Sequence, residues 1–103
     1  MNNELLKQRY GKINKVIPSS SYTKGYKQLV KEHRKDVIDK LRDILRDLRD
    51  FKVDTQYKNH PLDNKRYELH ITGDVLLTYK YDTGILYCDL ILLDLTNHKN
   101  LNK

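Results

Sequence analysis

Three of the chain's four histidines lie in its second half, and each borders a segment with the pattern of a β-strand. His60 precedes Pro61-Leu62, His70 precedes Ile71-Thr72, and His98 follows the last apolar run. An imidazole titrates near neutral pH, so it serves well as an acid or a base. RNA can be cut without a metal when one group removes the proton of the 2′-hydroxyl, a second protonates the leaving 5′-oxygen and cations stabilise the phosphate. If the three histidines meet around one groove, the chain holds the groups for this reaction.

Other side chains with suitable chemistry surround these histidines. Asp74 follows His70 in a His-x-x-x-Asp spacing and can fix a histidine tautomer or act as a base itself. The cations nearby are Lys58, Lys65, Arg66 and Lys80. The tyrosines that can stack on unpaired bases are Tyr57, Tyr67, Tyr79, Tyr81 and Tyr87.

A metal site is the main chemical alternative for the same residues. Imidazole and carboxylate groups suit zinc or iron, so a site of His60, His70, Asp74 and His98 is chemically possible. The spacings of these residues match no compact ligand signature, and the RNA chemistry requires no metal. We therefore predict a site without a metal or a cofactor.

The net charge of +6 is distributed unevenly along the chain. Residues 1–35 hold nine Lys or Arg against two Asp or Glu, whereas residues 36–103 hold 11 against 12. A basic first third suits a polyanion or an acidic protein partner, although lysine-rich surfaces also serve solubility alone. The single Cys88 excludes a disulfide framework and a Cys-rich zinc site. Because no apolar stretch approaches the roughly 18 residues that span a membrane, we expect a cytoplasmic protein without membrane contact.

The first half of the chain predicts helices. We expect one domain over residues 1–103, in which residues 1–15 form a basic extension that can be helical. Val16-Ile17 predicts a brief strand that Pro18 ends, and Ser19 to Ser21 offer N-caps for a first helix. Asp36 is the predicted N-cap of a second helix with an apolar stripe and a self-neutralised charged face. Since no Gly or Pro separates the two helices, they should form a tight hairpin.

From residue 54 onward the pattern changes to alternation. It predicts strands over Tyr67–Ile71, Val75–Tyr81 and Ile85–Leu93, with the last two joined by a turn at Asp82-Thr83-Gly84. Gly84 suits a positive φ at this turn. The predicted fold is therefore α+β: a short N-terminal strand and a two-helix hairpin packed on a small antiparallel sheet with a C-terminal three-strand meander.

Two segments resemble the signature of YafQ-type toxins, a branch of the RelE/ParE superfamily of toxin–antitoxin modules. These segments are Tyr57-Lys58-Asn59-His60-Pro61-Leu62 and the His-x-x-x-Asp strand that runs from His70 through Asp74 to Lys80. The resemblance covers roughly residues 16–101 and implies a RelE-like fold. It also implies a ribosome-dependent mRNA endonuclease that cuts translated message through a 2′,3′-cyclic phosphate.

The resemblance also assigns roles to residues. The family's catalytic positions correspond to His60, His70, Asp74 and His98. Together with the surrounding cations, this arrangement predicts that RNA is bound by Lys58, Lys65, Arg66, Lys80 and Tyr79. The implied partners are a cognate protein antitoxin, in a toxin–antitoxin hetero-oligomer, and the 70S ribosome with its mRNA.

Two alternatives share this fold. Val75 stands where the family usually has a tryptophan, and Asn97 stands where it usually has a glycine before the last histidine. These departures leave open a degenerate, non-catalytic toxin or a module that only binds RNA or antitoxin. The second alternative is a gyrase-directed toxin of the ParE branch.

Overall fold

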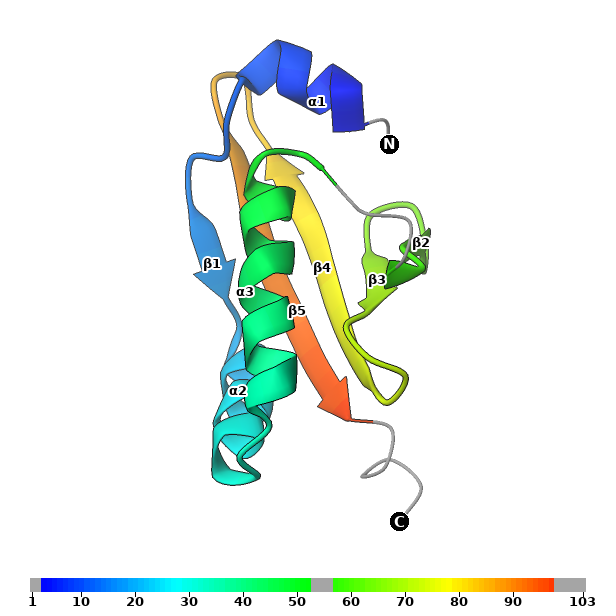
Figure 1. The fold of residues 1–103 in the computed structure, drawn as a ribbon. Helices are drawn as coiled ribbons and strands as arrows, with labels where there is room; N and C mark the ends of the chain where they lie inside the picture. Colours follow the sequence, from blue (N-terminus) through cyan, green and yellow to red (C-terminus); the bar gives the residue numbers. More distant parts are fainter. Residues whose placement is uncertain (1–2, 53–56, 98–103) are drawn as a thin grey trace.

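A five-stranded sheet with a helical hairpin on one face forms the body of the protein (Figure 1). The computed structural model describes residues 3–52 and 57–97. Its elements are α1 (Asn3–Tyr10), β1 (Val16–Pro18), α2 (Ser20–Lys31), α3 (Lys35–Arg49), β2 (His60–Pro61), β3 (Tyr67–His70), β4 (Val75–Thr83) and β5 (Cys88–Asn97). The predicted α+β fold is confirmed, including the short first strand, the helical hairpin and the meander.

The sheet has the strand order β1-β5-β4-β3-β2. The pairs from β2 through β5 are antiparallel, but β1 runs parallel to β5, with Val16 opposite Leu90. The sheet is therefore mixed and not wholly antiparallel as predicted. The strand β2 was not among the predicted strands, although His60 was expected to border one. Its two residues, His60 and Pro61, are too few to define a strand by alternation.

The helical hairpin follows the predicted caps only in part. Ser19 is the N-cap of α2, as predicted, and its hydroxyl oxygen accepts a hydrogen bond from the Tyr22 N–H at 3.1 Å. The prediction of Asp36 as the N-cap of α3 is wrong, because α3 begins at Lys35 and Asp36 lies in its first turn. There a negative charge still interacts favourably with the helix dipole. The exposed His33 adopts a φ of 57° between the helices, so the chain reverses there without a glycine.

The β4–β5 hairpin turns later than predicted. Thr83 pairs with Cys88, and the loop between them closes through the Gly84 N–H, which donates to the Tyr87 carbonyl at 2.8 Å. Ile85 and Leu86, predicted in the last strand, are 85% and 92% exposed in this loop. Gly84 does not have the positive φ that we predicted. A Cβ at this position would instead meet the ring of Tyr87, which is 42% exposed, so another residue here requires this ring to move.

The core lies between the helices and one face of the sheet. Alternate residues of β4, from Val75 to Tyr81, are buried there, and the Tyr81 hydroxyl donates to the Leu48 carbonyl of α3 at 2.9 Å. Leu6 of α1 is buried at the end of this core, and the Tyr10 hydroxyl donates to the Gly84 carbonyl at 2.8 Å. Alternation places the other side chains of β3 and β4 on the opposite face, where Glu68, His70, Thr78 and Lys80 are partly exposed and Leu76 is buried. We call this the open face. Among the described residues, no helix is long and apolar enough to cross a membrane.

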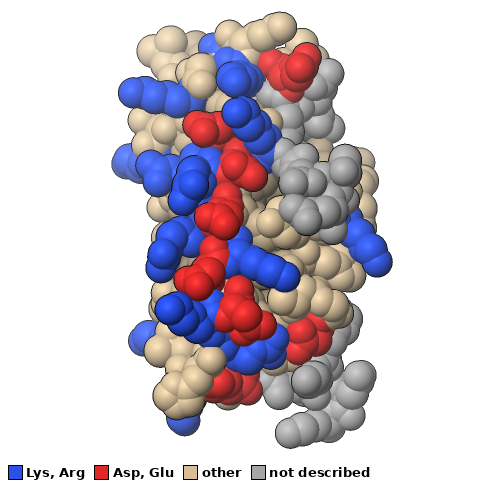
Figure 2. Space-filling model, in the orientation of Figure 1, with Lys and Arg blue, Asp and Glu red and all other residues tan. Residues whose placement is uncertain are grey.

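Charges on the helical side follow the predicted pattern. Acidic side chains form a column along α3, with Lys and Arg on both sides of it (Figure 2). Arg46 and Asp43 form one ion pair of this face at 3.4 Å. The charged face of α3 is therefore neutralised within the helix itself, whereas α2 exposes Lys24, Lys27 and Lys31.

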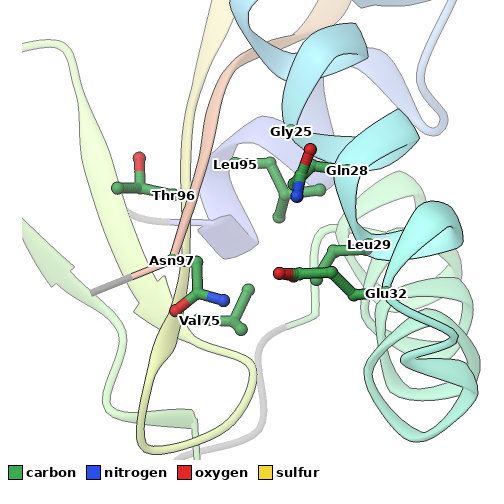
Figure 3. A pocket seen from close by; sticks show the side chains of 8 residues that line it. All are labelled: Gly25, Gln28, Leu29, Glu32, Val75, Leu95, Thr96 and Asn97. Carbon is green, nitrogen blue, oxygen red and sulfur yellow. The ribbon is translucent and has the colours of Figure 1, made fainter. Parts of the chain in front are cut away.

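Helix α2 packs very closely on β5. A Cβ at Gly25 would collide with the Leu95 carbonyl oxygen, so only glycine allows this approach. A recess opens beside this contact (Figure 3), lined by Gly25, Gln28, Leu29, Glu32, Val75, Leu95, Thr96 and Asn97. Of the predicted catalytic and RNA-binding residues that the structure describes, none lines this recess. The candidate site therefore lies elsewhere.

Candidate functional site

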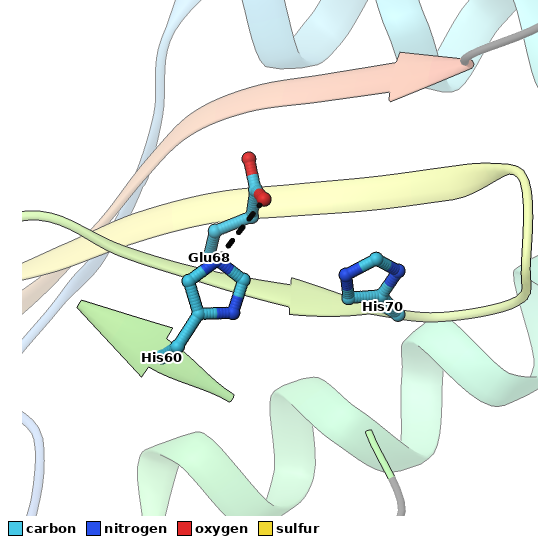
Figure 4. Close-up of side chains that lie close together, drawn as sticks. All are labelled: His60, Glu68 and His70. Atoms are coloured by element: carbon cyan, nitrogen blue, oxygen red, sulfur yellow. Dashed lines mark ion pairs between the residues drawn. The ribbon is translucent and has the colours of Figure 1, made fainter. Parts of the chain in front are cut away.

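Two of the predicted catalytic histidines meet on the open face of the sheet. The pairing of β2 with β3 sets His60 opposite Glu68, and His70 lies two residues further along β3 on the same face. The His60 and His70 rings are 6.1 Å apart between centroids, and His60 Nε2 lies 3.3 Å from Glu68 Oε1 (Figure 4). The structure therefore brings His60, Glu68 and His70 into one cluster, which we call the histidine cluster.

Glu68 is the member of this cluster that we did not predict. Its side chain is 20% exposed, whereas that of His60 is 45% exposed. The alternation in Tyr67-Glu68-Leu69-His70 contains a signal for it, since residues two apart on a strand share a face. The sequence contains no such signal for the pairing of His60 with Glu68, because the register of β2 against β3 is set only in the folded sheet.

The backbone fixes the orientation of the His60 ring. Nδ1 of His60 lies 2.9 Å from the Lys58 carbonyl oxygen, and Lys58 itself has a φ of 51°. A carbonyl oxygen only accepts hydrogen bonds, so Nδ1 carries the hydrogen and Nε2 faces Glu68. When Nε2 also carries a proton, His60 donates one hydrogen bond to the Lys58 carbonyl oxygen and another to Glu68 Oε1. The pair can therefore hold a proton at Nε2, at the exposed edge of the sheet.

Asp74 has different partners from the histidines. Its carboxylate accepts a hydrogen bond from the Thr72 hydroxyl at 2.7 Å and one from Arg34 Nη1 at 3.3 Å. These hydrogen bonds, that of Thr72 first and that of Arg34 next, hold the pKa of Asp74 below its ordinary value. Asp74 is thus ionised at neutral pH, which suits a group that orients or supplies charge. Its predicted catalytic role stays a prediction, and His98 lies outside the described residues.

The predicted cations line two recesses. Lys58 lines the first together with His70, and Lys40 of α3, which we did not predict, extends into the same recess. The second is lined by Asp63, Asn64, Lys65, Arg66 and Lys80. Asp63 shapes this loop by accepting from the N–H groups of Lys65 and Arg66 and from the Arg66 side chain, which lowers its pKa to about 2. The cations thus lie on the β2–β3 hairpin and on its neighbours α3 and β4.

The structure contradicts one predicted RNA contact. Tyr79 is only 1% exposed, its hydroxyl donates to Asn59 Oδ1 at 2.6 Å, and its ring stacks on Tyr67. Tyr79 points toward the helices because it alternates with Lys80 on β4, so it has no surface to offer a base. Tyr81 is buried in the same way.

Comparisons with known proteins give a consistent result. The family model described as the bacterial toxin of type II toxin–antitoxin system, YafQ, matches residues 14–103. None of the curated proteins compared with the chain matches it. Among solved structures, the E. coli DinJ–YafQ toxin–antitoxin complex has a TM-score of 0.68 at 26% identity, covering 85% of this chain and 96% of that chain.

Structures of Helicobacter pylori toxins are similar as well. A copper-bound mutant toxin has a TM-score of 0.62 at 28% identity, and the alignment covers 84% of this chain and 97% of that chain. A metal-bound toxin from the same organism has a TM-score of 0.63 at 27% identity, with the same shares covered.

Proposed function

Because the chain belongs to the YafQ family of bacterial toxins from type II toxin–antitoxin systems, we propose that it is a ribosome-dependent mRNA endonuclease. The observation that carries this proposal is the histidine cluster, which places two imidazoles and a carboxylate on one open face. The DinJ–YafQ complex supports a cognate protein antitoxin as a second partner of the chain.

The cluster can supply both proton transfers of RNA cleavage. One group removes the proton of the 2′-hydroxyl, whose oxygen attacks the phosphorus and forms the 2′,3′-cyclic phosphate. The bond from phosphorus to the 5′-oxygen breaks, and an imidazolium protonates that oxygen. The two rings lie 6.1 Å apart, so they can address different oxygens of one phosphodiester. Glu68 is suited to hold the His60 proton or to serve as the base.

Cations around the cluster can stabilise the negative phosphate. Lys58 and Lys40 line the recess beside His70, and the second recess adds Lys65, Arg66 and Lys80. Positive groups that are already in place stabilise the developing charge more strongly than mobile water does. In this proposal Asp74 orients the site as an anion, and His98 remains a further candidate for proton transfer.

Cleavage of translated message in a reconstituted translation reaction tests the proposal. We expect His70→Ala to lower the cleavage rate by about 100-fold or more, as for the loss of a general acid or base. Glu68→Gln should lower it by about 10-fold or more and leave antitoxin binding unchanged. His33→Gln is the matched control, since His33 is exposed and lines neither of the two recesses.

Three outcomes separate the rival functions. Wild-type protein that binds antitoxin but leaves translated messages intact would support a binding module. DNA damage signalling without message cleavage would support a gyrase-directed toxin. Full activity of Glu68→Gln and His70→Ala, with both variants folded, would remove the histidine cluster from the proposal.

A further inference from the structure

The histidine cluster has the composition of a transition-metal site. His60, Glu68 and His70 each offer one donor atom, and the three atoms lie within 4.8 Å of one another (Figure 4). Two imidazoles and one carboxylate form a common three-residue ligand set for Zn²⁺, and imidazole also suits the neighbouring divalent metals. All three residues come from the short β2–β3 hairpin, so the local fold alone brings these donors together.

The orientation of His60 provides an independent argument. Its Nδ1–H is held by the Lys58 carbonyl, so in the neutral ring Nε2 presents a lone pair to Glu68 Oε1, 3.3 Å away. Two acceptors at this distance repel each other unless a cation lies between them. That cation is either a proton or a metal ion. A ring that donates Nδ1–H to a backbone carbonyl while Nε2 faces outward is also the usual arrangement of metal-binding histidines.

The distances fit a small ion after a modest movement. Tetrahedral zinc, with bonds of about 2.0–2.1 Å, requires donor atoms roughly 3.4 Å apart. The His60–Glu68 pair already has this separation, at 3.3 Å. The remaining separations, at most 4.8 Å, can close by side-chain rotation, because His60 is 45% exposed and His70 is partly exposed.

We propose that His60, Glu68 and His70 bind a divalent transition-metal ion such as Zn²⁺, with solvent in the remaining coordination position. The metal would occupy the nitrogen and carboxylate lone pairs that proton transfer needs. It would therefore inhibit the nuclease; this second part rests on the proposed function, whereas the binding site does not. The chain would carry an endonuclease site that needs no metal and that zinc switches off.

Calorimetric titration of metal-free, full-length protein with Zn²⁺ tests the site directly. We expect one site, weakened at least about 10-fold in His60→Gln, Glu68→Gln and His70→Gln. His33→Gln should bind Zn²⁺ like the wild type, which controls for loss of an exposed imidazole. In NMR spectra of the imidazole nitrogens, Zn²⁺ should shift His60 Nε2 while Nδ1 keeps its hydrogen. Circular dichroism of each variant checks that it is folded.

The outcomes distinguish the two proposals. Equal Zn²⁺ affinity in the wild type and the three folded variants, or the absence of binding, would overturn the metal site. Zn²⁺ that binds the cluster but leaves cleavage by wild-type protein unchanged would overturn the inhibition. A wild-type protein that binds Zn²⁺ through the cluster, yet cuts no message when metal-free, would support the site and contradict the proposed nuclease.

Discussion

Two carboxylates near the histidines have different surroundings, and these surroundings suit them to different tasks. Glu68 faces His60 Nε2 across 3.3 Å at a partly exposed edge, where a proton or a cation can enter. Asp74 is held by Thr72 and Arg34, and its side chain is 24% exposed. Glu68 is therefore suited to exchange protons with a histidine, whereas Asp74 is suited to remain charged.

The Arg34–Asp74 contact leads to a prediction about stability and pH. It joins the bend of the helical hairpin to the β3–β4 turn at 3.3 Å. Since the folded-state pKa of Asp74 lies below its ordinary value, this stabilisation is present above the unfolded-state pKa of about 4 and is lost as pH falls through the folded-state pKa. We expect Asp74→Asn to lower the free energy of unfolding at pH 7 by about 1 kcal/mol, and this difference to shrink below pH 4.

Chemical denaturation of the wild type and the variant between pH 2.5 and pH 7 measures this difference. Asp36→Asn is the matched control, because Asp36 contacts the same guanidinium at the same 3.3 Å but is 61% exposed. At pH 7, Asp36→Asn should lower the free energy of unfolding by less than Asp74→Asn does. A loss in Asp74→Asn that stays constant down to pH 2.5 would contradict the prediction.

At the scale of elements, the contact between α2 and β5 sets how the helical hairpin sits on the sheet. Gly25 brings the α2 backbone against Leu95, and Ser19 fixes the start of α2 through its hydroxyl, which donates to the Leu93 carbonyl at 2.6 Å. Both contacts involve the backbone of β5, which cannot move aside without disturbing the sheet. The position of α2 is therefore determined by the sheet backbone.

Gly25→Ala should destabilise the protein even though alanine favours helices. The new Cβ would collide with the Leu95 carbonyl oxygen and lie 2.9 Å from the Leu95 Cβ. Overpacking costs about 1–3 kcal/mol, which exceeds the gain of up to about 1 kcal/mol in helix propensity. We expect a net loss of about 1–2 kcal/mol in the free energy of unfolding. Gly73→Ala is the control, since no atom lies within 4 Å of its Cβ position, and a similar loss in both variants would contradict the argument.

The sequence pattern predicted most elements and the pairing within the three-strand meander, but not the pairing of β2 with β3. The apolar stripe of α3 and the alternation of β4 identified both elements, because burial on one face leaves a regular pattern in the sequence. The histidine cluster depends instead on the register of β2 against β3, which a two-residue strand cannot reveal. Likewise, the residue type of Tyr79 led to the prediction that it contacts RNA. In the structure Tyr79 is buried, because its side chain lies on the face of β4 that packs in the core.

At the scale of the whole molecule, the contacts of α1 and the histidine cluster lie toward different ends of β4. α1 closes the end near Gly84 through Tyr10, and Leu6 enters the core there. His70 pairs with Leu76 toward the other end of β4, beside the β3–β4 turn. Figure 1 shows this separation, with α1 across one end of the sheet and β2 and β3 at its side. Substitutions in α1 should therefore affect stability, whereas substitutions in the histidine cluster should affect cleavage.

Leu6→Ala should lower stability without changing cleavage. Leu6 is 7% exposed, and removal of a buried leucine side chain costs about 2–5 kcal/mol; we expect the lower end, since α1 lies at the margin of the core. Below the unfolding transition, the rate of message cleavage should equal that of the wild type, because no residue of the histidine cluster moves. Glu68→Gln should behave in the opposite way, with slower cleavage and near-normal stability.

Leu5→Ala is the matched control, since the neighbouring Leu5 is 62% exposed on the same helix and its loss should change neither quantity. Thermal unfolding and cleavage assays on the same samples decide the question, and slow cleavage by fully folded Leu6→Ala would show that α1 acts on the site.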